Sequence, residues 1–157
     1  MWQLWSNMKS TSRIWPFQLS CEVDPSTEIE ILSKLEVFCN TWTSHNATIM
    51  ASATICERRF IFIAAEASQV SGCSQDGLRN AVNNIVCSLG LSILGNNHVV
   101  WTDAEGKWHS TDWLGMEDLQ LAEIKRKAIR MYSPLPLCME ELYQSWPLTA
   151  KDSVLLR

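Results

Sequence analysis

The residues best suited to chemistry lie in residues 66–77, which read Glu-Ala-Ser-Gln-Val-Ser-Gly-Cys-Ser-Gln-Asp-Gly. The stretch follows the most apolar run of the chain and precedes a pattern typical of an amphipathic helix. A cysteine at a helix N-terminus has its thiolate stabilised by the helix dipole, and a nearby imidazolium adds to this. Cys73 and His45 are therefore candidate catalytic residues, and Glu66 or Asp76 could orient the histidine.

The same stretch also has interpretations that involve no catalysis. Ser71 or Ser74 could cap the helix by accepting from free backbone amides, and Cys73 would then be a small buried side chain. The residue types favour this structural interpretation most, a binding site second and thiol catalysis third. The candidate ligand-binding residues are Ser71, Gly72, Cys73, Ser74 and Asp76. A small anion at the helix N-terminus is a weaker alternative, because Asp76 would repel it.

Composition restricts the kind of protein and its partners. The chain has 157 residues, of which 46% are hydrophobic and 19% charged, so it can build the core of one ordinary domain with an appendage. Its net charge of −4 disfavours nucleic acid as a partner. The basic cluster Lys125-Arg126-Lys127 with Arg130 is more typical of a solvated helix face.

The cysteines indicate a reducing compartment and no metal site. No two of them form a Cys-x-x-Cys pair, and no Cys/His group has the spacing of a structural zinc site. The sequence shows no apolar leader and no apolar run long enough to span a membrane, so we expect a cytoplasmic protein. We expect Cys21, Cys39, Cys56 and Cys87 to be core residues. P-loop, dinucleotide-binding, serine-hydrolase and zinc-protease motifs are absent, so we expect no cofactor.

The hydrophobic pattern predicts alternating strands and helices. Asp24-Pro25 is typical of a helix start, and the helix that follows places apolar side chains on one face. Residues 60–65, Phe-Ile-Phe-Ile-Ala-Ala, are apolar on both faces, which favours a central strand. Pro16 counts against a central position for the first strand. The predicted strands are 13–19, 47–56, 60–65 and 99–102, and the predicted helices begin at Pro25 and near Ser74.

This order, β-α-β-β-α-β, predicts an α+β protein with a ferredoxin-like antiparallel sheet. We expect residues 1–12 to form an N-terminal arm, residues 13–106 the ferredoxin-like domain and residues 107–157 a mostly helical C-terminal extension packed on the core. Eight tryptophans are unusual for this length, and Trp2 and Trp5 suggest that the arm docks on the body. Residues 116–131 and 139–146 are the helical segments expected in the extension.

The predicted topology brings two turns to one edge of the sheet. A hairpin about Glu57-Arg58 would set Ile55 opposite Phe60 and, further along, His45 opposite Val70. The end of the first helix and the start of the second lie at the same end of such a sheet. We therefore expect the His45 turn and the Cys73 turn to share an edge, with Arg58 at the opposite end.

Several short motifs resemble a known family. They are Trp42-Thr43-Ser44-His45, Ala51-Ser52, Arg59-Phe60-Ile61 and Ser71-Gly72-Cys73-Ser74 followed by Asp76, together with a tail from Glu141-Leu142 through Trp146 to Lys151-Asp152-Ser153. This set resembles a family of small bacterial proteins that carry the label "ABC transporter ATPase" without an established activity. The family has isoleucine where this chain has Gln75, and lysine where it has Gly77. The resemblance implies a cytoplasmic bacterial protein, while the missing Walker motif argues against P-loop ATPase activity.

Two functions follow as hypotheses. The first is a non-catalytic binding or self-association module. It would form a homodimer or hold a protein partner through a sheet face, because the two apolar faces of the sheet and the many tryptophans must be covered. The second is a thiol-dependent enzyme or redox sensor that uses Cys73 with His45. Neither hypothesis involves a cofactor, nucleic acid or a membrane span.

Overall fold

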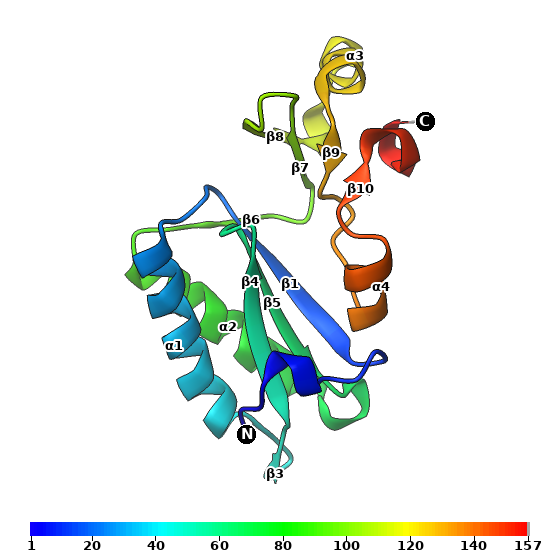
Figure 1. The fold of residues 1–157 in the computed structure, drawn as a ribbon. Helices are drawn as coiled ribbons and strands as arrows, with labels where there is room; N and C mark the ends of the chain where they lie inside the picture. Colours follow the sequence, from blue (N-terminus) through cyan, green and yellow to red (C-terminus); the bar gives the residue numbers. More distant parts are fainter. Residues whose placement is uncertain (157) are drawn as a thin grey trace. The chain divides into compact units, whose positions relative to one another are not determined.

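The computed structural model describes residues 1–156 and has a mixed α+β fold with antiparallel sheets (Figure 1). The chain divides into two compact units. Unit 1 comprises Met1–Leu94 with Leu137–Glu140, and unit 2 comprises Gly95–Pro136 with Glu141–Arg157. Short 3-10 helices lie at Trp5–Asn7, Ala67–Gln69, Trp113–Gly115, Ala150–Asp152 and Val154–Leu156.

Unit 1 contains an antiparallel sheet with helices on one face (Figure 1). Its strands are β1 (Arg13–Leu19), β4 (Ala51–Cys56), β5 (Phe60–Ala65) and β6 (Ile93–Leu94), in the order β4-β5-β1-β6. The helices are α1 (Pro25–Thr41) and α2 (Gly72–Ser88), and the small hairpin of β2 (Thr43–Ser44) and β3 (Ala47–Thr48) follows α1. The helix start predicted at Pro25 is confirmed, because the Asp24 carboxylate accepts from the backbone N–H of Thr27 at 2.7 Å.

The strand β5 is central, as its apolar sequence predicted. It pairs with β4 on one side and β1 on the other. Ile61 and Ile63 belong to the core beneath the helices. Phe60 and Phe62 alternate with them and are also fully buried.

Pro16 is accommodated in β1 because its missing N–H falls where no strand pairs. The backbone N–H of Ile14 donates to Leu137 O at 2.8 Å, on the side of β1 away from β5. Ladder bonds alternate along a strand, so the position of the Pro16 nitrogen is on that same side. There β6 pairs only with Gln18 and Leu19.

The predicted fourth strand is wrong for this sheet. Residues 99–102 lie in unit 2, and the two-residue strand β6 occupies the edge beside β1 instead. The strand order therefore does not establish the predicted ferredoxin-like topology. The predicted β4–β5 register is also wrong by one residue, since Cys56 rather than Ile55 faces Phe60. Glu57 and Arg58 adopt positive φ values of 53° and 51°, and with Arg59 they make a longer turn than a two-residue hairpin.

The first residues of the chain dock along unit 1, as the early tryptophans suggested. The backbone N–H of Trp2 donates to Asn40 Oδ1 at 3.0 Å. The backbone N–H of Gln3 donates to Ala51 O, also at 3.0 Å. The segment thereby covers the outer edge of β4, which would otherwise present unpaired backbone groups.

Unit 2 contains a second antiparallel sheet, in the order β10-β9-β7-β8. Its strands are β7 (His98–Thr102), β8 (Trp108–Asp112), β9 (Arg130–Met131) and β10 (Leu148–Thr149). The remaining helices are α3 (Asp118–Lys127) and α4 (Met139–Gln144). The core of unit 2 consists of Val99, Trp101, Ile124, Ala128 and Met131.

Residues 107–157, predicted to be a mostly helical extension, contain α3, α4 and three 3-10 helices, but they also contribute three strands to this sheet. The helix predicted to run to Met131 ends earlier, because the backbone N–H of Ile129 donates to Thr102 O at 2.8 Å. Met131 then pairs with Trp101 and is fully buried. Residues that helical spacing alone would place in the helix therefore pair with β7 instead.

Candidate functional site

The start of α2 is a helix cap built from two serines. Ser71 is the N-cap, and its Oγ accepts from the backbone N–H of Ser74 at 3.3 Å. The two hydroxyls lie 2.8 Å apart, and Ser74 Oγ donates to Thr43 O at 3.1 Å. The capping interpretation is confirmed for Ser71, and the bond from Ser74 to Thr43 O ties the start of α2 to the segment that follows α1.

Trp42 joins the end of α1 to the start of α2. Its indole N–H donates to Ser74 O at 3.0 Å, and the side chain is buried. Its ring packs edge-to-face on Trp15, with centroids 6.0 Å apart, and lies 5.7 Å from the ring of Phe38. The end of the first helix and the beginning of the second therefore share an edge, as the topology predicted.

His45 lies at the tip of the β2–β3 hairpin. His45 and Asn46 form a two-residue turn with positive φ values of 50° and 65°, the conformation that such hairpin turns require. The His45 side chain is exposed. The turn therefore presents the imidazole to solvent at the same edge as the α2 cap.

Two hollows meet at this edge, and together we call them the edge groove. One has a volume of about 390 Å³ and the other about 420 Å³. Both are lined by His45 and Ser71. The first is lined in addition by Phe38, Thr41, Trp42, Thr43, Cys73, Ser74 and Gly77. The second is lined in addition by Ser44, Ala47, Thr48, Ser68, Gln69 and Val70.

Cys73 lies open on the edge groove, so the interpretation of its side chain as a buried filler is wrong. Gly77 lies one helical turn further along the same face of α2 and also lines the groove. A Cβ atom at Gly77 would meet no heavy atom within 4 Å. The glycine thus leaves the space beside the thiol empty.

The carboxylates that could have oriented His45 are engaged elsewhere. Asp76 pairs with Arg79 at 3.7 Å on the exposed face of α2. Glu66 accepts from Ser12 Oγ at 3.3 Å and lies 3.8 Å from the ammonium group of Lys9. The structure thus brings His45, Cys73, Ser71 and Ser74 to one groove, whereas it leaves Asp76 outside it.

The other cysteines differ in their exposure. Burial raises the pKa of the Cys39 thiol to about 12 and that of Cys56 to about 11, so both resist ionisation at neutral pH. Cys21 and Cys87 are exposed, which corrects their assignment to the core. Cys87 lies in the last turn of α2 on its solvent face. A single exposed hydrophobic residue is common on protein surfaces, so residue type alone did not indicate burial.

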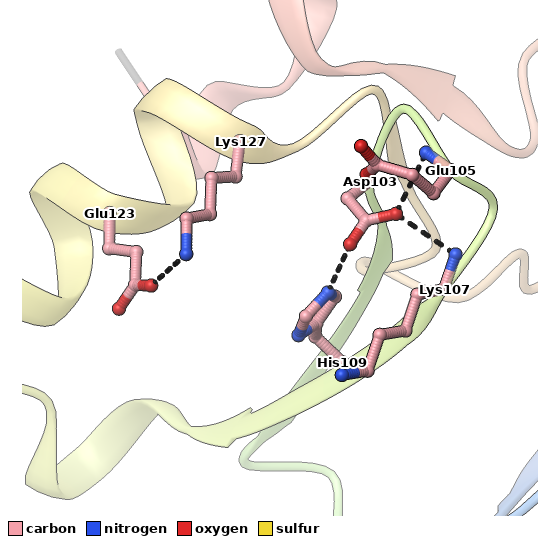
Figure 2. A network of polar contacts seen from close by, with 6 residues as sticks. All are labelled: Asp103, Glu105, Lys107, His109, Glu123 and Lys127. Carbon is pink, nitrogen blue, oxygen red and sulfur yellow. Dashed lines mark hydrogen bonds and ion pairs between the residues drawn. The ribbon is translucent and has the colours of Figure 1, made fainter.

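Unit 2 contains a polar network that the sequence did not reveal (Figure 2). Asp103 Oδ1 accepts from the backbone N–H groups of Glu105 and Lys107, both at 3.0 Å. Its Oδ2 lies 2.8 Å from His109 Nε2. The Asp-Ala-Glu-Gly turn between two strands was the available signal, because an aspartate that begins a tight turn accepts from the backbone that follows.

The network gives no indication of a metal site. Among residues 1–156, no cluster of three or more histidine, cysteine, aspartate or glutamate side chains is arranged to hold a metal ion. Within the same residues, no helix has the length and apolar character needed to cross a membrane.

Comparison of the chain with protein-family models, with curated proteins and with solved structures gave no match. The resemblance carried by the Ser-Gly-Cys-Ser-x-Asp motif therefore stays a prediction. The local role of this motif is clear from the hydrogen bonds, since Ser71 caps α2, Ser74 bonds to Thr43 O and Cys73 faces the groove.

Proposed function

We propose that this chain is a non-catalytic binding module whose ligand occupies the edge groove of unit 1. The observation that carries the proposal is the meeting of the two hollows at His45 and Ser71. Each volume lies within the range of small-molecule sites. The hydroxyls of Ser71 and Ser74 are fixed by hydrogen bonds to each other and to Thr43 O, so the groove has a preformed polar wall.

The groove is a better binding surface than either sheet face. Phe60, Phe62 and Ile63 cover both faces of β5, and none of these side chains is accessible to solvent. A homodimer or partner held through a sheet face would need such residues to be exposed. Because these residues are buried, we place the proposed contact at the groove instead, where the side chain of Phe38 is only partly buried.

The lining suggests the class of ligand. Phe38 and Trp42 provide an aromatic wall, while Thr41, Thr43 and Ser71 provide hydroxyl or backbone groups beside it. Aromatic rings stack well on such a wall, and hydroxyl groups fix orientation by hydrogen bonds. The proposed ligand is a small aromatic group that carries a hydrogen-bonding substituent, either free or at the end of a peptide.

Filling the groove tests this proposal. Gly77→Leu places a side chain in the space that is empty of heavy atoms, and leucine is a better helix former than glycine, so the fold should persist. With indole and phenol as probes, ¹H–¹⁵N spectra of the wild type should shift at Cys73 and Gly77. In Gly77→Leu, the dissociation constant obtained by titrating the Cys73 signal should rise at least about tenfold, which corresponds to ~1.4 kcal/mol of lost affinity.

Asn80→Leu is the matched control, because Asn80 is exposed on the same helix but does not line the groove. This variant should bind both probes as the wild type does. Equal binding by Gly77→Leu, or probe shifts that cluster away from the groove, would count against the proposal.

A second candidate is supported by the exposure of Cys73. A thiol-dependent enzyme or redox sensor needs an accessible thiol near a base, and Cys73 and His45 line the same hollow. Among the described residues, the two side chains share no hydrogen bond, so the pair would have to close on a substrate. This candidate comes second for that reason.

Labelling with iodoacetamide separates the two candidates, because α2 carries an exposed cysteine near each end. Cys73 and Cys87 are both exposed, so both should be labelled near neutral pH, and Cys87 serves as the internal reference for the rate at Cys73. Cys39 should stay unlabelled, since its thiolate fraction is very small at a pKa of about 12. Peptide mass spectrometry over a time course provides the measurement.

The thiol candidate makes one further demand on this experiment. In His45→Ala, the labelling of Cys73 should slow while that of Cys87 in the same sample stays constant. If His45→Ala changes neither rate, Cys73 acts only as part of the binding surface.

The sheet of unit 1 supports a finer inference about its topology. With β6 as the fourth strand, the order β4-β5-β1-β6 has the first and third strands of the predicted pattern in its centre. We infer a ferredoxin-like sheet whose fourth strand is shortened to two residues. Membership of the bacterial family and a cytoplasmic location stay predictions.

A further inference from the structure

The strand β8 forms one edge of the unit 2 sheet. Within residues 1–156, β7 is the only strand that pairs with it (Figure 1). The other sheet edges are short or covered, because β6 and β10 have two residues each and the N-terminal segment bonds to β4. An uncovered edge of five residues presents backbone groups with which another strand can pair.

The hydrogen bonds at the ends of the hairpin define which backbone groups of β8 point outward. The backbone N–H of Trp113 donates to Asn97 O at 2.8 Å, and an equivalent bond closes the other end of the hairpin. Along an antiparallel pair, bonded and non-bonded positions alternate. In the register of β7 and β8, Thr111 therefore bonds to β7. Ser110 and Asp112 direct their backbone groups away from β7.

The outward side of β8 is open and has none of the usual devices against pairing. Ser110 and Asp112 are exposed, whereas Thr111 between them is partly buried. The strand reads Trp-His-Ser-Thr-Asp, so it contains neither lysine nor proline, and it pairs with β7 without a bulge. Lysine, proline and bulges are the features with which proteins commonly prevent edge strands from pairing. The edge can therefore accept a further strand.

We propose that the β8 edge pairs with the β8 edge of a second copy of this chain, antiparallel and with the two-fold axis at Ser110. This register opposes all five residues of β8. It sets Ser110 opposite the partner's Ser110 and Asp112 opposite the partner's Trp108, so that no like charges face each other. A two-fold axis at Asp112 would instead set two carboxylates opposite each other, which disfavours that register.

The charges at the two ends of β8 favour a second copy as the occupant. Lys107 precedes the strand and Asp112 ends it. Antiparallel pairing brings the end of one β8 beside the start of the other, so each Asp112 comes near the partner's Lys107. The strand is therefore complementary to itself in charge as well as in backbone pattern.

Leu114 gives a second reason for this occupant. It follows β8 closely and is 84% exposed, the largest exposed fraction among the large hydrophobic side chains of the described residues. In the proposed register Leu114 comes beside the partner's Gly106, in the turn before β8. A Cβ atom at Gly106 would meet no heavy atom within 4 Å, so the space at this turn is open. The pairing would thus cover an apolar side chain that otherwise lies in water.

The proposed interface is small, so its dimer should be weak. Stable interfaces bury about 1,200–2,000 Å² in total, which is more than two strands of this length supply. We therefore expect a dissociation constant of about 100 μM. At that value the chain is mostly monomeric at about 20 μM and mostly dimeric at about 1 mM.

Amide exchange in the intact chain tests the pairing residue by residue. In ¹H–¹⁵N spectra, protection at Ser110 and Asp112 should rise about three- to fivefold between about 20 μM and about 1 mM, as the free monomer is depleted. The amide of Thr111 should be protected already at the lower concentration, because it bonds to β7. Light scattering on the same samples should show the mean mass approaching that of two copies.

Matched variants test whether β8 is the surface that associates. Ser110→Lys would place two ammonium groups at the two-fold axis, so the concentration dependence should disappear while Thr111 stays protected. Ser110→Thr keeps the hydroxyl and favours a strand, so it should associate at least as strongly as the wild type. Gly77→Leu, in the edge groove of unit 1, should leave the association unchanged, which separates this proposal from the binding function.

Two results would overturn the proposal. The first is a constant mass, or constant protection at Ser110, in the wild type up to about 1 mM. The second is association of Ser110→Lys with the strength of the wild type, which would place the contact on another surface.

Discussion

Replacing Trp42 with alanine is expected to lower the free energy of unfolding by about 3–5 kcal/mol, the usual cost of removing a buried tryptophan. Trp42 is 4% exposed and packs against Trp15 and Phe38. Its indole also makes the hydrogen bond that ties α1 to the first turn of α2. Urea denaturation followed by circular dichroism gives the measurement, because Trp42→Ala changes tryptophan fluorescence directly.

Trp42→Phe is the matched control for this variant. Phenylalanine keeps an aromatic ring in the core but removes the indole N–H, so the loss should be nearer to about 1–2 kcal/mol. The difference between the two variants measures packing separately from the hydrogen bond. A loss below about 1 kcal/mol in Trp42→Ala would mean that the α1–α2 edge is not a packed part of the fold.

Replacing Ile63 with alanine is expected to cost about 2–5 kcal/mol, because the side chain lies in the middle of the central strand. Ile63 is fully buried, pairs with Ala53 of β4 and Trp15 of β1, and belongs to the core beneath the helices. Its loss should leave a cavity that neither neighbouring strand can close. The midpoint of urea unfolding should fall with little change in slope.

Two further variants bracket that result. Ile63→Val removes one methyl group and should cost only about 0.5–1.5 kcal/mol. Leu119→Ala, at a side chain that is 81% exposed on α3, should change stability by less than about 0.5 kcal/mol. If Ile63→Ala were as mild as Leu119→Ala, β5 would not be the central strand of a packed sheet.

Much of unit 1 could be predicted because its local signals agree with its packing. The apolar run of residues 60–65 indicated a central strand, and β5 has strands on both sides. Asp24 and Ser71 cap α1 and α2 in the places that their residue types indicated. In each case a short stretch of sequence contains the whole physical reason for the structure.

The sheet edge could not be predicted, because its strand is too short to leave a pattern. Ile93–Leu94 has only two paired residues, whereas Val99–Thr102 is a run of β-branched and aromatic residues and was the stronger signal. The same limit explains β9 and β10, because β9 forms by pairing with β7 and β10 forms by pairing with β9. Such short strands are selected by tertiary contact rather than by propensity.

The candidate site was predicted in position but not in orientation. The His45 and Cys73 turns share an edge, yet Cys73 is exposed. Helical spacing contained the necessary signal, since Ser74, Leu78 and Val82 recur every four residues and form the buried face of α2. The turn that follows Asp103 could indicate its backbone hydrogen bonds, but its contact with His109 left no such pattern, because that contact depends on the path of the hairpin.

Gly77 has a consequence for how this protein balances stability against function. Glycine within a helix costs about 0.5–1 kcal/mol relative to alanine, and no neighbouring atom obstructs a larger side chain at this position. The helix therefore gives up stability at the point where a side chain would narrow the groove beside Cys73. A residue that lowers stability without a packing reason is typical of a position where a larger side chain would impair binding.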